Sequence, residues 1–325
     1  MCVRVPREKG EETRQNLADE GVLNRDLRIE REDGFLYIPV HEPPVSGDDD
    51  TVVEKRDFDV RDTETDASDI LGYEPRFEVV GDIALLEPEE DEEAGDALVE
   101  ADNGVVTALR VESPVEGEER TRRMSHVAGE KKTTTVHREY GREFVVDLTE
   151  VYFTPRLAEE RERVASQVGE DETVFDMFAG VGPFTVAAAE KGTKVVASDI
   201  NPRAIELLRE NAKRNNVAER IEAYNEDARE VARRVAEEGG ADRVYMNLPH
   251  TAEEFLDSAM DALHDEGGVV HYYDIRHEDD LFEGAVEEIS KAAETAGYDV
   301  EVLERVTVRS YAPYDYNVCV DGRLF

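Results

Sequence analysis

Alternating strand-like and helical segments run through residues 151–325, and this alternation limits the fold of the chain more than any other feature. Five segments rich in β-branched and aromatic residues are each followed by a helical pattern: residues 173–180, 194–200, 221–228, 242–249 and 267–275. Repeated strand–helix units predict an α/β fold built on a parallel, doubly wound sheet. A final strand at 316–325 follows a turn that is too short for a crossover, so we expect it to run antiparallel.

The first half of the chain is organised differently. Residues 1–66 predict a small domain with a helix over 9–20 and a strand over 34–40. An acid-rich segment follows, which is a linker by composition or at most a weakly packed extension. Residues 67–150 hold short β-branched runs between glycine and acidic turns, which is typical of a sheet-rich domain. The strand–helix repeats of 151–325 form the third part, so we expect three domains.

The net charge of the chain is extreme. It carries 79 Asp and Glu residues against 38 Lys and Arg residues, a formal net charge of −41. The acids are spread through periodic apolar segments, and lysine is scarcer than arginine. Such a composition is typical of halophilic archaea, whose salt-rich cytoplasm screens the self-repulsion of the surface. We therefore attribute the charge to habitat and not to function.

Targeting segments and metal motifs are not expected. No apolar run approaches the roughly 20 residues that a membrane span needs, and the first residues lack the apolar core of a signal peptide. We expect a cytoplasmic protein without membrane contact. Cys2 and Cys319 lie near opposite ends of the chain, without histidines at metal-ligand spacing, so we expect neither a disulfide framework nor a zinc site.

One segment departs from the acidic average, because residues 120–142 contain seven basic side chains and only two acidic ones. We call these basic residues the basic island: Arg120, Arg122, Arg123, Lys131, Lys132, Arg138 and Arg142. A net positive segment in so acidic a chain predicts an anionic partner. The alternative is a pair of strands whose alternating charges are simply solvated.

Acidic residues end three successive strands of the expected sheet: Asp176, Asp199 and Asp227. Parallel strands present their carboxyl ends at one edge, where the glycines of DMFAGVGPF let a ligand approach the backbone. Thr185 stands where a dinucleotide fingerprint needs its third glycine, which disfavours pyrophosphate and a nicotinamide oxidoreductase. The three acids instead suit S-adenosylmethionine, which has no phosphate and carries a positive sulfonium. Each acid alone would be read as a helix cap or a turn residue.

Asn247, Leu248 and Pro249 follow the fourth strand at the same edge. In a methyltransferase of this fold, that position faces the transferable methyl group. The proline fixes the turn, and the asparagine amide can both donate to and accept from the edge of a planar base. The triplet resembles the Asn-Pro-Pro class of amino methyltransferases, with leucine in place of the first proline. A simple turn is the alternative interpretation.

The motifs DMFAGVGPF, SDINPRAIELL, NLP, HVAGE, VYFTPRLAEER and RSYAP closely resemble the archaeal and eukaryotic tRNA guanine-37 N1-methyltransferase family. The resemblance covers essentially the whole chain. It implies a Rossmann-like class I methyltransferase domain with two smaller N-terminal α+β domains. It also implies methyl transfer from S-adenosyl-L-methionine to N1 of the guanine 3′ of the anticodon. The partner would be tRNA, contacted at its anticodon stem-loop and outer corner by a monomer.

The resemblance also implies roles for single residues. The catalytic positions are Glu160 as the general base, Arg120 as a donor to O6, Asn247 and Tyr152. Guanine N1 carries a proton that a base must remove, and the charge that develops on O6 suits a guanidinium donor. Without the resemblance, Glu160 would be read as a solvated helix residue and Arg120 as a phosphate contact. We expect Arg120, Glu160 and Asn247 to converge on one cleft between the two larger domains.

The remaining site positions are assigned in the same way. The cofactor positions are Arg161, Asp176, Phe178, Gly180, Asp199, Ile200, Asp227, Ala228 and Asn247. The RNA-binding positions are Arg122, Arg123, Lys131, Lys132 and Pro249. Two alternatives stay open: transfer of the aminocarboxypropyl group of the same cofactor to a modified guanine in the wybutosine pathway of tRNA, and a noncatalytic RNA-binding module.

Overall fold

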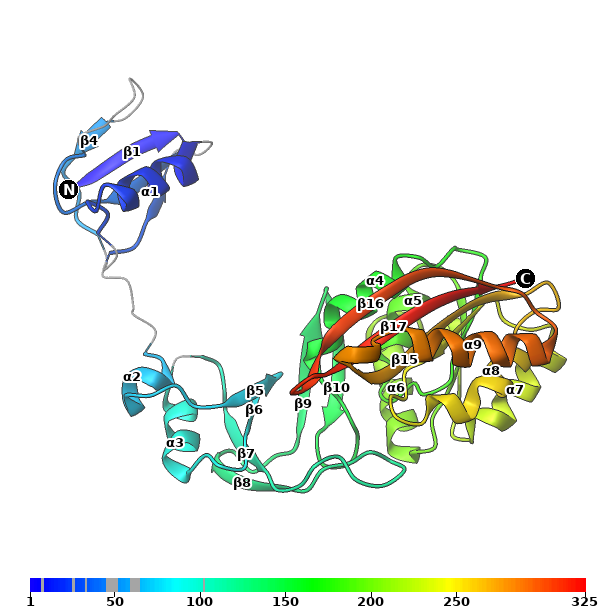
Figure 1. The fold of residues 1–325 in the computed structure, drawn as a ribbon. Helices are drawn as coiled ribbons and strands as arrows, with labels where there is room; N and C mark the ends of the chain where they lie inside the picture. Colours follow the sequence, from blue (N-terminus) through cyan, green and yellow to red (C-terminus); the bar gives the residue numbers. More distant parts are fainter. Residues whose placement is uncertain (7–8, 25–26, 33, 45–51, 59–64, 102) are drawn as a thin grey trace. The chain divides into compact units, whose positions relative to one another are not determined.

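The computed structural model of the chain describes residues 1–6, 9–24, 27–32, 34–44, 52–58, 65–101 and 103–325. The chain divides into two compact units, Met1–Thr65 and Asp66–Phe325 (Figure 1). Each unit has buried hydrophobic clusters of its own.

The smaller unit is an antiparallel four-stranded sheet in the order β2-β3-β1-β4, with one α-helix among its described residues. Its elements are β1 (Cys2–Pro6), α1 (Gly10–Asp19), β2 (Glu30–Glu32), β3 (Phe35–Pro39) and β4 (Val52–Glu54). Val5, Leu17 and Ile38 belong to one buried cluster, so the helix packs against the sheet. The helix and the strand predicted over 9–20 and 34–40 are confirmed.

The edge strand β4 lies in the acid-rich segment for which the sequence predicts a linker or at most a weakly packed extension. It pairs antiparallel with β1. Arg56, just after it, donates to Glu30 and Glu32 at 2.6 and 2.8 Å. Because ladder hydrogen bonds and ion pairs hold this edge, the strand forms without the apolar run on which the prediction depended. Val52 and Val53 are 41% and 42% exposed, so this strand agrees with the weakly packed extension that the sequence allows.

The larger unit begins with a four-stranded sheet in the order β5-β6-β7-β8. The elements of this part are α2 (Ala67–Leu71), β5 (Phe77–Val80), β6 (Ile83–Leu86), α3 (Glu92–Glu100), β7 (Thr107–Val111) and β8 (Met124–Gly129). The helix α3 connects β6 to β7, which run parallel, whereas the other neighbours run antiparallel. Ala84, Ala97 and Leu98 belong to the cluster between this sheet and its helices.

The hairpin of β9 (Thr134–Glu139) and β10 (Arg142–Asp147) joins this part to the rest of the unit. The backbone N–H of Val145 donates to Oδ1 of Asn211 on α6 (Pro202–Arg214) at 2.7 Å. Phe144 of the hairpin and Val174 of the larger sheet belong to one buried cluster. The hairpin therefore shares its core with the sheet that carries the cavity described below.

The larger sheet has seven strands in the order β13-β12-β11-β14-β15-β17-β16. The strands are β11 (Thr173–Asp176), β12 (Lys194–Ser198), β13 (Ile221–Tyr224), β14 (Arg243–Met246), β15 (Gly268–His277), β16 (Val300–Ala312) and β17 (Asp315–Leu324). The strands from β11 to β15 pair parallel, and β17 pairs antiparallel with both β15 and β16. The parallel sheet and the antiparallel final strand are both confirmed.

Helices cover both faces of this sheet, as Figure 1 shows from green to red. The α-helices are α4 (Ala158–Ala165), α5 (Pro183–Ala189), α6, α7 (Ala228–Glu237), α8 (Leu256–Asp261) and α9 (Glu283–Ala296). The 3-10 turns are η2 (Pro155–Leu157), η3 (Ala218–Arg220), η4 (Ala252–Phe255) and η5 (Glu278–Asp280). The chain winds from β11 toward β13 on one side and from β14 toward β15 on the other. Ligands bind at such a switch point, outside the carboxyl ends of the strands.

None of the helices in the described ranges is long and apolar enough to cross a membrane.

Candidate functional site

A cavity of about 580 Å³ lies at the switch point, outside the carboxyl ends of β11, β12 and β14. Residues 117–120 and 152–154 also line it, as do residues of the β16–β17 hairpin. The cavity therefore collects side chains from segments that lie far apart in the sequence.

The turn after β11 shapes one side of the cavity. Gly180 has a φ of 57°, a left-handed conformation that glycine adopts without strain. Its N–H donates to Oδ2 of Asp199 at 2.8 Å, and the N–H of Asn201 donates to Oδ1 at 2.9 Å. Burial raises the pKa of Asp199. Two backbone donors thus hold this carboxylate at the cavity wall, with lone pairs left for the hydroxyls of a ligand.

Asp176 lies beneath the cavity and is only 1% exposed, so it does not line the wall as the neighbouring residue Phe178 does. Its Oδ2 accepts a hydrogen bond from Thr185 at 2.7 Å, whereas its buried Oδ1 has no hydrogen-bond partner among the described residues. Burial, with the charge of Asp199 adding to it, raises the pKa of Asp176 to about 7. Thr185, which replaces the fingerprint glycine, thus orients a buried acid.

Asp227 lines the far side of the cavity with Ile200 and Ala228. Its carboxylate caps α7 by accepting the N–H of Arg229 at 2.8 Å. Phe178 packs edge-on against Phe255, with ring centroids 4.9 Å apart, and the Arg229 guanidinium lies 3.8 Å from the Phe255 ring centroid. This arrangement offers a flat, partly apolar place for a planar ring, with an acid at its rim.

The cavity fits S-adenosylmethionine better than a dinucleotide. Asp176, Asp199 and Asp227 all lie at or beneath its wall, and carboxylates repel a pyrophosphate but attract a sulfonium or an ammonium group. The unpartnered Oδ1 of Asp176 is a buried acceptor that a positive ligand group nearby would stabilise. This set of carboxylate acceptors therefore matches a cationic, hydroxyl-bearing nucleoside.

Arg120, Tyr152 and Asn247 meet on the other side of the cavity, and all three line it with Pro249. The Arg120 guanidinium lies 5.5 Å from the centroid of the Tyr152 ring. Arg120 has a φ of 54°, so a left-handed turn aims the side chain at the cavity. These residues come from three separate segments, and the structure brings them together.

Glu160 is placed differently from these three residues. Its side chain is buried but does not line the cavity, although Arg161 beside it does. Both Glu160 oxygens bind the Arg163 guanidinium at 2.7 Å, and the Tyr273 hydroxyl donates to Oε1 at 2.7 Å. The predicted convergence on one cleft therefore holds for Arg120 and Asn247, which share the cavity. It does not hold for the Glu160 carboxylate in this conformation, because Arg163 and Tyr273 hold it outside the lining.

Arg161 is almost fully buried at the cavity wall. It donates to Glu139 at 2.6 Å and to the carbonyl oxygen of Thr154 at 2.8 Å. Its guanidinium also lies 5.1 Å from the ring centroid of Phe153. The predicted cofactor residue is therefore held rigidly by the hairpin and by the turn before α4.

The basic island is largely paired within the chain. Arg142 is 3% exposed and donates to Glu190 and Glu162, each at 2.8 Å, so it joins elements and does not face a partner. Lys132 pairs with Asp82 at 2.6 Å.

Other members of the island differ in their pairing. Arg138 pairs with Glu143 at 2.7 Å, and Arg123 lies 3.8 Å from Glu116. Lys131 is exposed and has no ion pair among the described residues. A single stretch of sequence therefore does not give one continuous positive surface.

Some cavity residues were not predicted from the sequence. Arg309, Tyr311 and Asn317 line the cavity from the β16–β17 hairpin, and Phe255 lines it from η4. The RSYAP motif contains Arg309 and Tyr311, so a signal was present, but no role followed from it. Phe255 lies in a helical pattern where an aromatic residue is normally read as core.

Two family models match the chain. The TRM5/TYW2 methyltransferase domain matches residues 135–303, and the tRNA methyltransferase 5 N-terminal domain matches residues 2–48. The tRNA (guanine(37)-N(1))-methyltransferase Trm5b of Pyrococcus abyssi is 41% identical, over 100% of this chain and 99% of that protein.

Solved structures agree with these matches. A complex of aTrm5 and tRNALeu superposes with a TM-score of 0.71 at 33% identity and covers 100% of both chains. The TYW2 protein of Methanocaldococcus jannaschii, solved in complex with AdoMet, gives a TM-score of 0.61 at 27% identity and covers 77% of this chain and 99% of that one. The full-length match and the domain models lead to one conclusion: the chain belongs to the TRM5/TYW2 methyltransferase family.

Proposed function

We propose that the chain is a tRNA (guanine-37-N1)-methyltransferase, which transfers a methyl group to N1 of the guanine 3′ of the anticodon. The observation that carries this proposal is the meeting of Arg120, Tyr152 and Asn247 with the acids of the β11–β13 edge at one cavity. A cofactor side and a base side are thus contiguous, as direct methyl transfer requires. The similarity to Trm5b over the full chain supports the same function.

The cofactor is S-adenosyl-L-methionine, and it supplies a methyl group on a positively charged sulfur. Asp199 would accept from its ribose hydroxyls, and Asp227 from its adenine amino group. Phe178, Ile200 and Ala228 would flank the adenine ring, whereas Asp176, Gly180 and Arg161 would serve the end that carries the sulfonium. These assignments agree with the burial and hydrogen bonds of the acids.

The residues that would contact the guanine base have different roles in methyl transfer. Glu160 would take the proton from N1 as the methyl group arrives, so that the product base stays neutral. Arg120 would donate to O6 as negative charge grows there, and the Asn247 amide would orient the base edge. Tyr152, which lies under the Arg120 guanidinium, would close the site around the base.

The substrate is tRNA, and we infer that the three expected domains divide its recognition. Residues 1–66 would contact the outer corner of the tRNA, while residues 67–150 would guide the anticodon stem-loop to the catalytic domain, 151–325. Arg122, Arg123, Lys131, Lys132 and Pro249 would contact the RNA. Because a salt-rich cytoplasm screens phosphate attraction, recognition would depend mainly on tRNA shape and on an extruded base. We infer a monomer that works in that compartment.

Labelled S-adenosylmethionine, mixed with a tRNA transcript in high potassium chloride, tests the proposal. Transcripts with G37 should gain label at N1, and A37 transcripts should gain none. Glu160→Gln should lose most turnover and keep its cofactor affinity. The proposal would be refuted if G37 transcripts gained no label at cofactor concentrations that saturate the enzyme.

Aminocarboxypropyl transfer is the second candidate, because the family model joins TRM5 with TYW2. The match of residues 2–48 to the tRNA methyltransferase 5 N-terminal domain favours methyl transfer. Mass analysis of the product nucleoside separates the two reactions, since one adds a methyl group and the other a much larger amino acid chain. A noncatalytic RNA-binding module would instead fail to bind S-adenosylmethionine in calorimetry.

A further inference from the structure

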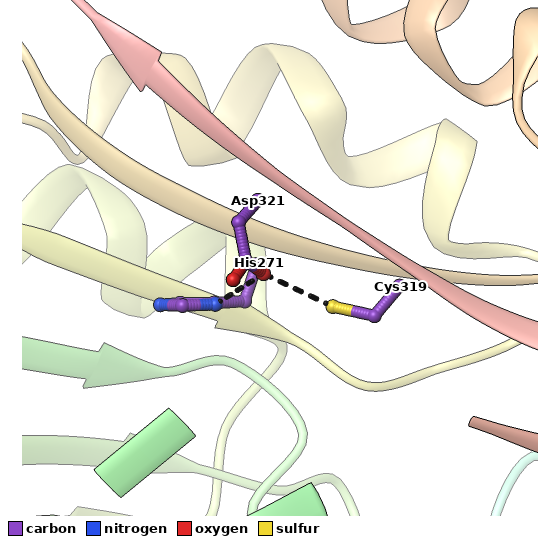
Figure 2. A group of neighbouring side chains, drawn as sticks. All are labelled: His271, Cys319 and Asp321. Atoms are coloured by element: carbon purple, nitrogen blue, oxygen red, sulfur yellow. Dashed lines mark hydrogen bonds and ion pairs between the residues drawn. The ribbon is translucent and has the colours of Figure 1, made fainter. Parts of the chain in front are cut away.

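A buried polar network lies behind the cavity, on the strands β15 and β17. Figure 2 shows its centre, where His271, Cys319 and Asp321 meet, and their ligand-type atoms all lie within 4.8 Å of one another. All three side chains are at most 1% exposed. Buried groups of this kind are stable only when their hydrogen bonds are satisfied.

The hydrogen bonds determine the protonation states of this centre. Arg243 lies 2.8 Å from Nε2 of His271, and because a guanidinium only donates, Nε2 is the acceptor. The other ring nitrogen, Nδ1, therefore carries the proton and donates to Oδ1 of Asp321 at 2.7 Å. Burial lowers the pKa of His271, so the ring is neutral. Burial opposes ionisation of Asp321, but hydrogen bonds from His271 and Arg163 hold its pKa far below the ordinary value.

This pairing leaves no free ligand set for a metal ion in the cluster. Both nitrogens of His271 are engaged, and Asp321 accepts from His271, Arg163 and the Cys319 thiol. Burial raises the pKa of Cys319 well above its ordinary value, which keeps the thiol protonated. The cluster is a hydrogen-bonded support, and its outermost member is Arg163.

Arg163 is shared among three carboxylates, of which Glu160 and Asp321 are buried. It binds both oxygens of Glu160 at 2.7 Å and Oδ2 of Asp321 at 2.6 Å, and it also reaches the half-exposed Glu304 at 2.8 Å. Tyr273 donates to Glu160 from the other side, and burial raises the pKa of that phenol, so it keeps its proton. The two oxygens of Glu160 therefore accept from two neighbours, Arg163 and Tyr273.

We propose that Arg163 is the positioning residue of the general base Glu160. We also propose that Asp321 weakens the effect of Arg163 on Glu160, because Asp321 takes up part of the Arg163 charge. The proposal rests on the proposed function of Glu160. A buried carboxylate without a counter-charge takes up a proton and can no longer act as a base, so Arg163 keeps Glu160 ionised. A guanidinium devoted to Glu160 alone would instead make that carboxylate a poor proton acceptor.

Because Arg163 is shared by Glu160 and Asp321, Glu160 can stay ionised and still accept a proton. Glu160, Arg163 and Asp321 together carry one excess negative charge, since His271 is neutral. When Glu160 accepts the N1 proton, Arg163 keeps Asp321 as its counter-ion, and no buried charge is left unpaired. The network thus supports Glu160 both before and after proton transfer.

Replacing Arg163 and replacing Asp321 should shift the pH–rate profile in opposite directions. Single-turnover methylation of a G37 transcript, at saturating cofactor and tRNA, would be followed from acid to alkaline pH. Arg163→Gln removes the counter-charge, so the acid limb should move to higher pH by about 1 to 3 units. Asp321→Asn leaves Glu160 as the only buried carboxylate on Arg163, with the half-exposed Glu304 beside it, so the limb should move to lower pH while the plateau rate falls.

The rate that Arg163 variants can lose is limited by what the general base contributes to the rate. Arg163→Gln should lower the rate at neutral pH by about 100-fold, the lower end of what general base catalysis contributes. Arg163→Lys keeps the charge but not the bidentate contact, so it should restore the position of the limb and only part of the rate. Cofactor affinity by calorimetry should stay at the wild-type value in all three variants.

Arg233→Gln is the matched control, because Arg233 and Glu230 form a bidentate pair with the same i, i+3 spacing on the exposed face of α7. Its profile should equal that of the wild type. Should Arg163→Gln fail to fold, the shift of the limb to lower pH in Asp321→Asn, compared with the unshifted limb of Arg163→Lys, still decides the matter. Equal rate losses without any displacement of the acid limb would reduce Arg163 and Asp321 to structural residues and overturn the proposal. If the wild-type protein left G37 unmethylated, the proposed function itself would fail.

Discussion

Arg120 donates from Nη1 to the carbonyl oxygen of Pro249 at 3.3 Å, although the two residues lie 129 positions apart in the sequence. The contact ties a turn that begins the basic island to the turn after β14. Because Asn247 belongs to that second turn, the guanidinium and the amide face the same part of the cavity. The bond also holds Arg120 in place before any base enters, which limits the ordering that binding must supply.

Replacing Arg120 should reduce the rate of methyl transfer without weakening cofactor binding. Arg120→Lys keeps the positive charge but loses the planar fork, and we expect a fall of about 100-fold, or roughly 3 kcal/mol of transition-state stabilisation. Single-turnover kinetics at saturating tRNA measures the loss. The control is Arg233→Lys, because Arg233 is exposed on α7 and does not line the cavity, and it should leave this rate unchanged. A rate loss in Arg233→Lys as large as that in Arg120→Lys would contradict the role at O6.

Replacing Asp199 should weaken cofactor binding and spare tRNA binding. Asp199→Asn places an NH2 group against a backbone N–H of Gly180 or Asn201, so it loses one charge-assisted bond and an acceptor for the ribose. We expect the calorimetric Kd for S-adenosylmethionine to rise by about 10- to 100-fold, which corresponds to about 1.5–3 kcal/mol.

The control for this variant is Asp242→Asn. Asp242 also accepts a backbone N–H, that of Thr173 at 2.7 Å, but it does so at the opposite edge of the sheet. Its Kd for the cofactor should equal that of the wild type. Equal weakening in both variants would mean that the loss is one of fold stability and not of ligand contact.

The arrangement of the larger sheet could be predicted because it follows from periodicity and loop length. Alternating strands and helices leave few topologies, and the short turn before residue 316 rules out a crossover. The edge acids and Asn247 could be located for the same reason, since each lies at the carboxyl end of a strand or within three residues after it. Periodicity alone does not predict which side chains meet across neighbouring strands.

The support of Glu160 shows this limit. Arg163 is three residues along the same helix, so its ion pair could have been predicted from spacing alone. Asp321 and Tyr273 could not, because they reach this place through the antiparallel register of β15 and β17, in which His271 lies opposite Asp321 and Tyr273 opposite Cys319. A shift by one residue would turn all these side chains to the other face of the sheet.

Asp176 should make the stability of the protein depend on pH. Its pKa is about 7 in the folded state and 3.8 in the reference state, so folding favours the protonated acid. Its contribution is fully present below about pH 4 and is lost as the pH rises through about 7. Asp176→Asn removes this dependence, because the amide cannot ionise.

Urea denaturation of the cofactor-free protein measures this effect. The variant and the wild type should have equal free energies of unfolding near pH 4. At pH 8 the variant should be the more stable by up to about 4 kcal/mol, which is what a displacement of three units corresponds to. A difference that stays constant between pH 4 and pH 8 would show that Asp176 does not titrate in this range.

RNA binding should depend on the members of the basic island unequally. Lys131 is exposed and has no ion pair among the described residues, whereas Lys132 already pairs with Asp82 at 2.6 Å. A side chain that must first leave a carboxylate contributes less to phosphate binding. We therefore expect Lys131→Ala to raise the Kd for tRNA more than Lys132→Ala does.

The whole set of Arg122, Arg123, Lys131 and Lys132 should matter far more than an equal number of acids. Replacing these four by alanine should weaken tRNA binding and lower the slope of log K against log salt by up to about 3, because fewer counterions are released. The matched control neutralises four exposed acids, Glu237, Glu283, Glu287 and Glu294, with glutamine. Those acids are spread over α7 and α9 and should change the slope little, since salt screens their repulsion. A salt titration in which both sets change the slope equally would assign the RNA affinity to net charge and not to the basic island.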